Sequence, residues 1–165
     1  MQEITFSKAT ELTSPNPVTL ICTKTPDGRT NLATVSWYTP VSFKPPMLAF
    51  VMSKTSYSGE CLRDSGRAAL VFPGAELSKV VMQCGSVSGR TLDKPFEFGI
   101  RLAPVGECPV QVPVHSRLVF DCALDQAVEV SDHYLYICNI HGSYADESKS
   151  QIYALNGYAS VGVLA

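Results

Sequence analysis

Charged residues are scarce in this sequence, and neither sign of charge is in marked excess. Asp, Glu, Lys and Arg make up 17% of the 165 residues, and the formal net charge is −2. A protein that binds the phosphates of nucleic acid needs a basic surface, so we expect no nucleic-acid partner. Any anionic ligand would have to be held by a small local group of cations.

The sequence also lacks the usual features of secreted and membrane proteins. The N-terminal residues carry no charged flank or apolar run of a signal peptide, no segment approaches membrane-spanning length, and no N-glycosylation sequon is present. The six cysteines include no Cys-x-x-Cys pair, and most lie in apolar segments where a free thiol behaves as a small hydrophobic residue. We therefore expect a cytoplasmic protein with reduced cysteines and no membrane association.

Two common phosphate-binding signatures are missing as well. The sequence contains no Gly-x-x-x-x-Gly-Lys-Ser/Thr loop and no Gly-x-Gly-x-x-Gly after a first strand. It also lacks the regular alternation of strands with long helices on which P-loop and Rossmann folds depend. A phosphate site in this chain would have to be built on another fold.

Strand signals dominate the remaining pattern. Six segments have the apolar, β-branched composition of strands: 18–23, 31–38, 47–52, 67–72, 116–124 and 133–140. The Pro26-Asp27-Gly28 turn would join the first two in a hairpin. We expect residues 1–165 to form a single, mainly β domain, a mostly antiparallel β-barrel.

Helix signals are few and short. An apolar stripe with helical spacing runs through 76–84 and ends at Gly85, a common C-terminal stop. A second short helix is predicted through 60–63, capped by Ser56 or Ser58 and ending near Gly66. The N-terminus of this second helix would add a partial positive charge to any anion site beside it.

Two segments rich in glycine and hydroxyl side chains are the best candidates for such a site. Residues 84–94 contain three serine or threonine hydroxyls near Arg90 and Lys94, and residues 53–58 repeat this chemistry after an apolar strand. Glycines let backbone N–H groups approach a ligand, hydroxyls donate hydrogen bonds, and Arg or Lys neutralises charge. The pattern predicts a pocket for one phosphorylated ligand. Each segment alone is also compatible with an ordinary turn or cap.

Several blocks of sequence, in order, resemble the FMN-binding split-barrel, flavin reductase-like family, and within it flavoredoxin most closely. These blocks cover about residues 18 to 141 and include 31–37, Pro45-Pro46, 53–56, 85–90, Asp93-Lys94 and 131–137. The resemblance implies a six-stranded antiparallel split β-barrel with Greek-key connectivity and a few short helices. It also implies a homodimer with one FMN bound near each subunit interface.

The resemblance further assigns roles to individual positions. It places four residues along the isoalloxazine ring: Thr34, Val35, Ser36 and Trp37. It places the ribityl chain and phosphate against Ser53, Lys54, Thr55 and Ser56. It completes the phosphate site with Gly85, Ser88, Gly89, Arg90 and Lys94, of which Arg90 is the first candidate for contact with the phosphate.

His133 is the candidate catalytic residue, because the resemblance places its counterpart near the flavin face where nicotinamide approaches. A strand histidine bonded to a backbone carbonyl is the alternative interpretation. Trp37 likewise fits either a ligand-stacking role or packing in a core or interface. His133 and His141 have no supporting carboxylate cluster, so we predict no metal site. Cys84 is expected to serve packing, because its position at a helix C-terminus disfavours the thiolate.

Three functions remain open on the sequence alone. The first is an NAD(P)H-dependent flavin reductase that passes hydride through FMN to a flavin or protein acceptor. The second is a flavoredoxin-type electron carrier that holds FMN tightly and exchanges electrons with a protein partner. The third is a non-catalytic flavin-binding protein.

Overall fold

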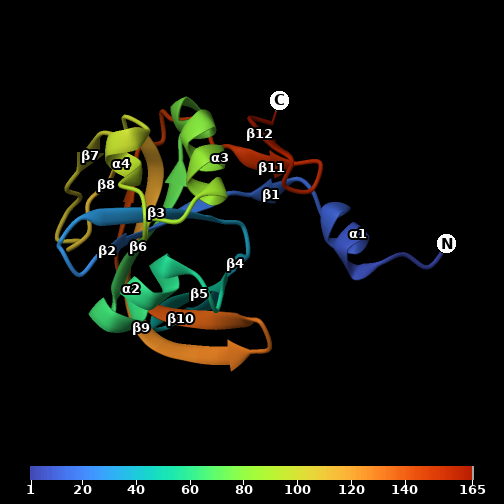
Figure 1. The fold of residues 1–165 in the computed structure, drawn as a ribbon, viewed down its shortest axis with the longest axis horizontal. Helices are drawn as coiled ribbons and strands as arrows, with labels where there is room; N and C mark the ends of the chain where they lie inside the picture. The colour runs from blue at the N-terminus through green and yellow to red at the C-terminus, as the bar shows by residue number, and fades with distance from the viewer. Residues whose placement is uncertain (165) are drawn as a thin grey trace.

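A computed structural model describes residues 1–164 and is built around one seven-stranded antiparallel sheet (Figure 1). Its strands, in spatial order, are β3 (Thr30–Val35), β2 (Thr19–Lys24), β6 (Arg67–Pro73), β9 (Ser116–Val130), β10 (His133–Ala145), β5 (Pro46–Ser53) and β4 (Tyr38–Phe43). The edge strands β3 and β4 are consecutive in the chain and are separated by only two residues. The sheet must therefore curl until its two edges meet.

Ser36 and Trp37 form the corner that joins the two edge strands, and this corner gives the curled sheet the form of a split barrel. The backbone N–H of Val51 in β5 donates to the carbonyl of Trp37, the residue before β4, at 3.0 Å, which extends the β4–β5 pairing up to this corner. In the described chain β3 and β5 are not neighbours in the hydrogen-bonded sheet, so the barrel is split along this side. This confirms the predicted mainly β, antiparallel split-barrel fold.

All six predicted strands are present, with one difference at the corner. The sequence pattern predicts one strand over 31–38, whereas the chain turns at Ser36 and Trp37 and begins a seventh strand, β4. Edge strands tolerate proline because one side of the strand needs no N–H donor, and Pro40 lies in β4. The apolar pattern alone did not separate the two strands.

The helices are few and short, as expected. They are α1 (Phe6–Glu11), α2 (Tyr57–Ser65), the 3₁₀ helix η1 (Ala75–Leu77), α3 (Ser78–Ser86) and α4 (Lys94–Glu97). Ser56 caps α2 by accepting from the Gly59 N–H at 3.3 Å, and Gly66 ends it with a φ of 69°. The predicted stop at Gly85 is one residue early, because α3 continues through Ser86.

Two small sheets complete the fold. One joins β1 (Asn16–Pro17), β11 (Tyr153–Leu155) and β12 (Ser160–Gly162), and the other joins β7 (Leu102–Ala103) and β8 (Val112–Pro113). Helix α1 projects away from the body in Figure 1 and has no buried residue. None of the helices in residues 1–164 combines the length and apolarity needed to cross a membrane.

The core has two parts because both faces of the central strands are covered. In β2, Leu20 and Cys22 belong to a cluster shared with Val81 of α3, whereas Ile21 belongs to the cluster that contains Phe50 of β5. In the sequence, a strand that is buried on both faces is a continuous run of apolar residues and does not alternate between apolar and polar residues. The first cluster fixes α3 against the barrel, and this positions one wall of the cavity described next.

Candidate functional site

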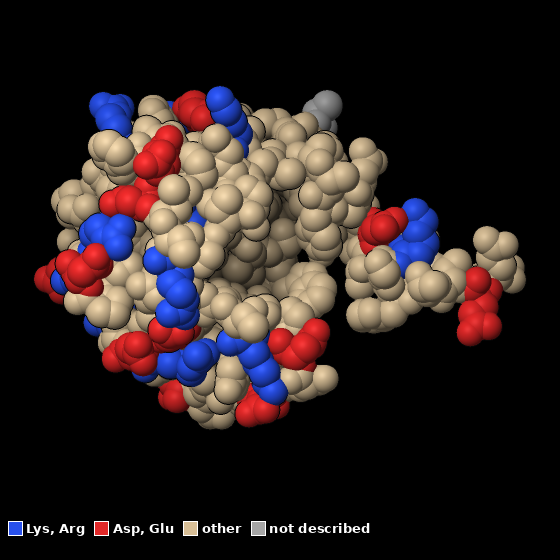
Figure 2. All heavy atoms as spheres, viewed as in Figure 1, with Lys and Arg blue, Asp and Glu red and all other residues tan. Residues whose placement is uncertain are grey.

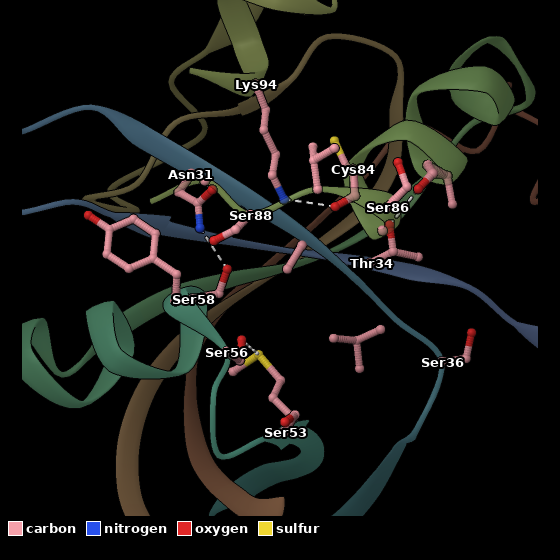
Figure 3. A pocket seen from close by; sticks show the side chains of 18 of the residues that line it. Asn31, Thr34, Ser36, Ser53, Ser56, Ser58, Cys84, Ser86, Ser88 and Lys94 are labelled. Atoms are coloured by element: carbon pink, nitrogen blue, oxygen red, sulfur yellow. Dashed lines mark hydrogen bonds between the residues drawn. The ribbon is translucent and has the colours of Figure 1, made fainter. Parts of the chain in front are cut away.

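A cavity of about 760 Å³ lies at the split in the barrel, between β3, the end of β5, the start of α2 and α3. It opens on the face shown in Figure 2 and is seen from close by in Figure 3. Its volume is within the range of about 300–1,000 Å³ typical of small-molecule sites. Its lining comprises Asn31, Ala33, Thr34, Val35, Ser36, Trp37, Val51, Met52, Ser53, Thr55, Ser56, Tyr57, Ser58, Val81, Met82, Cys84, Gly85, Ser86, Val87, Ser88, Gly89, Lys94, His133 and Tyr158.

The two hydroxyl-rich segments singled out in the sequence meet in this one cavity. Every candidate site residue lines it except Lys54 and Arg90. Residues 53–58 run from the last residue of β5 into α2, whereas residues 84–89 complete α3 and the turn after it. The sheet curvature brings together segments that are about thirty positions apart in the chain.

One end of the cavity is lined by hydroxyl and amide groups. Ser53 Oγ and Thr55 Oγ1 lie 3.0 Å apart, and the Asn31 amide donates to Ser58 Oγ at 2.8 Å. Residues 56–58 also form the N-terminal turn of α2, whose backbone N–H groups carry a partial positive charge. This end of the cavity is suited to an anionic, hydroxyl-bearing group.

Lys94 supplies a buried cation to the cavity wall. The residue is 3% exposed, and its Nζ donates to the Leu32 carbonyl at 2.6 Å and to the Cys84 carbonyl at 2.7 Å. Figure 3 shows the amine pointing from α4 toward the cavity between β3 and α3. Burial lowers the pKa of this ammonium from its usual value. Two of the three ammonium donors are used by these carbonyls.

Lys54 and Arg90 lie at the rim and are paired with carboxylates. Lys54 forms an ion pair with Glu129, and Arg90 forms one with Glu60. Lys94 lines the cavity, whereas Arg90 lies outside its lining, so contact between Arg90 and the phosphate stays a prediction. The ranking from sequence did not include the Glu60 carboxylate that engages Arg90 or the Leu32 carbonyl that accepts from Lys94, because both are distant in the chain.

Asn31 is the most important lining residue that the sequence interpretation did not name as a site residue. Its side chain is buried, and its Oδ1 has no hydrogen-bond partner among the described residues. The Cα of Gly89 faces that oxygen so closely that a Cβ there would lie 1.7 Å from it. The sequence contains little signal for this role, because β3 contains other polar residues and the glycine-rich segment that Asn31 meets is far away in the chain.

The other end of the cavity is aromatic. Trp37 is 44% exposed, and its ring centroid lies 5.5 Å from that of His133. Its indole N–H donates to Tyr158 Oη at 2.8 Å, so the turn between β11 and β12 covers this end. The side chain of Trp37 therefore lines the cavity and is not part of the core.

His133 is held by a neighbouring carboxylate and not by a backbone carbonyl. Its Nδ1 lies 2.8 Å from Asp132 Oδ1, and this bond lowers the pKa of the Asp132 carboxyl from its usual value. The contact leaves Nε2 as the ring nitrogen available for a ligand.

The cysteines are buried free thiols, as predicted. Cys84 lines the cavity, and burial raises its pKa to about 11. A thiol with so high a pKa is a poor nucleophile, so Cys84 serves packing. Among residues 1–164 no three His, Cys, Asp or Glu side chains are grouped as a metal site.

Comparisons with known proteins agree with this architecture. The sequence matches the family described as the flavin reductase like domain over residues 12–162. YddH, an uncharacterized protein of Escherichia coli (strain K12), is 33% identical over 134 residues, which cover 79% of this chain and 70% of that protein.

Solved structures share the fold at lower identity. Flavoredoxin from Methanosarcina acetivorans matches with a TM-score of 0.85 and 22% identity, over 100% of this chain and 92% of that chain. A Shewanella frigidimarina NCIMB 400 protein described as having a split barrel domain matches with a TM-score of 0.84 and 15% identity, over 96% and 87% of the chains. The chain thus belongs to the flavin reductase-like family of flavin-binding proteins.

Proposed function

We propose that this chain binds FMN in the cavity and transfers electrons from a nicotinamide donor, through FMN, to a flavin or protein acceptor. The observation that carries the proposal is the division of one cavity into a hydroxyl-rich end and an aromatic end. FMN has a polar phosphorylated tail and a flat ring system, and each half matches one end. Bound FMN supplies the hydride and electron-transfer chemistry that side chains lack.

The hydroxyl-rich end fits the ribityl phosphate. Ser53, Thr55, Ser56 and Ser88 offer hydroxyl donors there, and the first turn of α2 adds backbone N–H groups. The unpartnered Asn31 Oδ1 is an acceptor suited to a ribityl hydroxyl. Lys54 and Arg90 at the rim add positive charge at longer range.

The aromatic end fits the ring. Val35 and Met82 provide apolar surface, and Trp37 and His133 provide flat faces, all in the lining of the same cavity. The remaining Lys94 donor can stabilise negative charge that develops on a bound ring. His133, oriented by Asp132, is placed to hold or release a proton beside the ring.

The visible spectrum tests the proposal. The purified protein mixed with FMN is expected to bind it and to show a perturbed flavin absorption band. Under anaerobic conditions, added NADH or NADPH is expected to bleach that band. Persistent colour with both nicotinamides would instead favour a carrier that takes electrons from a protein donor. Absence of any flavin binding would contradict the proposed function.

We further propose a homodimer that uses the outer face of β5, β10 and β9. Val51, Leu135 and Val128 lie side by side in register across these three strands, and none of them belongs to either core cluster. Val128 is 40% exposed. The adjacent row contains Ser53 and His133, both of which line the cavity, so a partner on this face would lie beside the ligand.

Substitution of Val128 by lysine is expected to convert the dimer to a monomer, because it places a charge at the centre of an apolar interface. Light scattering after size-exclusion chromatography measures the mass directly. Phe96→Lys is the matched control, because Phe96 is an exposed apolar residue on α4. A wild-type protein that is monomeric at micromolar concentration would contradict the proposal.

A further inference from the structure

Besides the hydroxyl groups, the polar end of the cavity includes the side chain of Tyr57. Tyr57 is the first residue of α2 and lines the cavity. Glu60 lies three residues later and therefore on the same side of the helix. Arg90 approaches both residues from the turn after α3, on the opposite side of the cavity.

These three side chains are tied to one another. The Arg90 guanidinium lies over the Tyr57 ring, 4.7 Å from its centroid. Its two terminal nitrogens donate to the two Glu60 carboxylate oxygens, one of them at 3.3 Å. Such a bidentate pair fixes the plane of the guanidinium as well as its position. We call these three residues the Tyr57–Glu60–Arg90 cluster.

The cluster links the two segments that form the polar end of the cavity. Tyr57 and Glu60 belong to α2, whereas Arg90 follows Ser88 and Gly89, and the Arg90 N–H donates to Ser88 Oγ at 3.2 Å. A ligand whose tail ends at the hydroxyl groups would stop at the Tyr57 ring. A longer ligand would have to displace this ring and the stacked guanidinium.

The cluster also places the Glu60 carboxylate where a longer ligand would have to pass, with Arg90 bound to both of its oxygens. The hydrogen bond from Arg90 lowers the pKa of the Glu60 carboxyl, so this group is ionised at neutral pH. A second phosphate would lie near this carboxylate, and the Arg90 guanidinium beside it already donates to the two carboxylate oxygens. Like charges brought together at a binding site discriminate strongly against the wrong ligand.

We infer that the Tyr57–Glu60–Arg90 cluster restricts the site to flavin mononucleotide and selects against FAD, whose second phosphate and adenosine have to pass it. The inference rests on the proposed function, because it assumes that the phosphate occupies the hydroxyl-rich end. It assigns to these three residues a specificity role and not a part in electron transfer.

The test compares dissociation constants for FMN, FAD and riboflavin, measured by flavin fluorescence titration. The wild type is expected to bind FMN more tightly than FAD. In Glu60→Gln the ratio of the FAD constant to the FMN constant is expected to fall about tenfold, because repulsion of the second phosphate is lost. Tyr57→Ala should lower the same ratio by removing the wall.

Glu76→Gln is the matched control. Glu76 and Glu60 are similarly exposed carboxylates, each in an ion pair with a basic side chain, and Glu76 is not part of the Tyr57–Glu60–Arg90 cluster. Because exposed ion pairs contribute little to folding stability, both variants are expected to fold. A ratio unchanged in Glu60→Gln and Tyr57→Ala, or a wild type that binds FAD as tightly as FMN, would overturn the inference. Failure to bind any of the three flavins would overturn the proposed function itself.

Discussion

Substitution of Lys94 by methionine is expected to weaken flavin binding by about 100-fold and to destabilise the fold by about 2–4 kcal/mol. The stability loss has a local cause, because the Leu32 and Cys84 carbonyls would lose their buried donor. A buried carbonyl left without a partner costs about 1–3 kcal/mol. The binding loss follows from removal of the cation that lines the cavity wall.

Urea denaturation of the protein without flavin measures the first effect, and fluorescence titration with FMN measures the second. Lys79→Met is the matched control, because Lys79 is an exposed lysine on α3. It should change both quantities by less than about twofold or 0.5 kcal/mol. If Lys94→Met bound FMN as tightly as the wild type, Lys94 would be a structural residue only, and its assignment to the binding site would be wrong.

The contrast between Lys94 and Arg90 shows what local sequence can and cannot predict. Both cations lie in the same glycine-rich segment, so composition alone treats them as equivalent. Their positions are set by groups outside this segment, since Glu60 engages Arg90 and the Leu32 carbonyl accepts from Lys94. Contacts between distant parts of the chain determine which of the two cations lines the cavity. A short sequence motif does not contain those contacts.

The strands and the two hydroxyl-rich turns were predictable because they depend on residues that are close together in the sequence. Apolar runs such as 47–52 and turn residues such as Gly66 act over a few positions, and the structure confirms both. The corner at Ser36 and Trp37 was not predictable, because β4 continues the apolar character of β3. Tyr158 lines the cavity because the small sheet of β1, β11 and β12 places the turn before β12 there. The sequence pattern did not predict the strands of this sheet.

Substitution of Gly89 by alanine is expected to reduce FMN affinity by about 100-fold through a steric clash within the binding site. A Cβ at this position would lie 1.7 Å from Asn31 Oδ1 and 2.5 Å from its Cγ. Both residues are buried, so the amide cannot simply move into solvent. It must rotate away, which breaks its 2.8 Å bond to Ser58 Oγ and disturbs the hydroxyl-rich end of the cavity.

A double-mutant cycle separates this clash from a general loss of stability. Asn31→Ala removes the atoms that the new methyl group would strike, so Asn31→Ala with Gly89→Ala should be no less stable than Asn31→Ala alone. Additive losses in the unfolding free energies would show that Gly89→Ala acts through something other than Asn31. Gly85→Ala is the matched control in the same cavity, because its Cβ would come no closer than 3.3 Å to Thr34. It should retain FMN affinity within a few-fold, since alanine is tolerated in the last turn of a helix and only one side chain has to adjust.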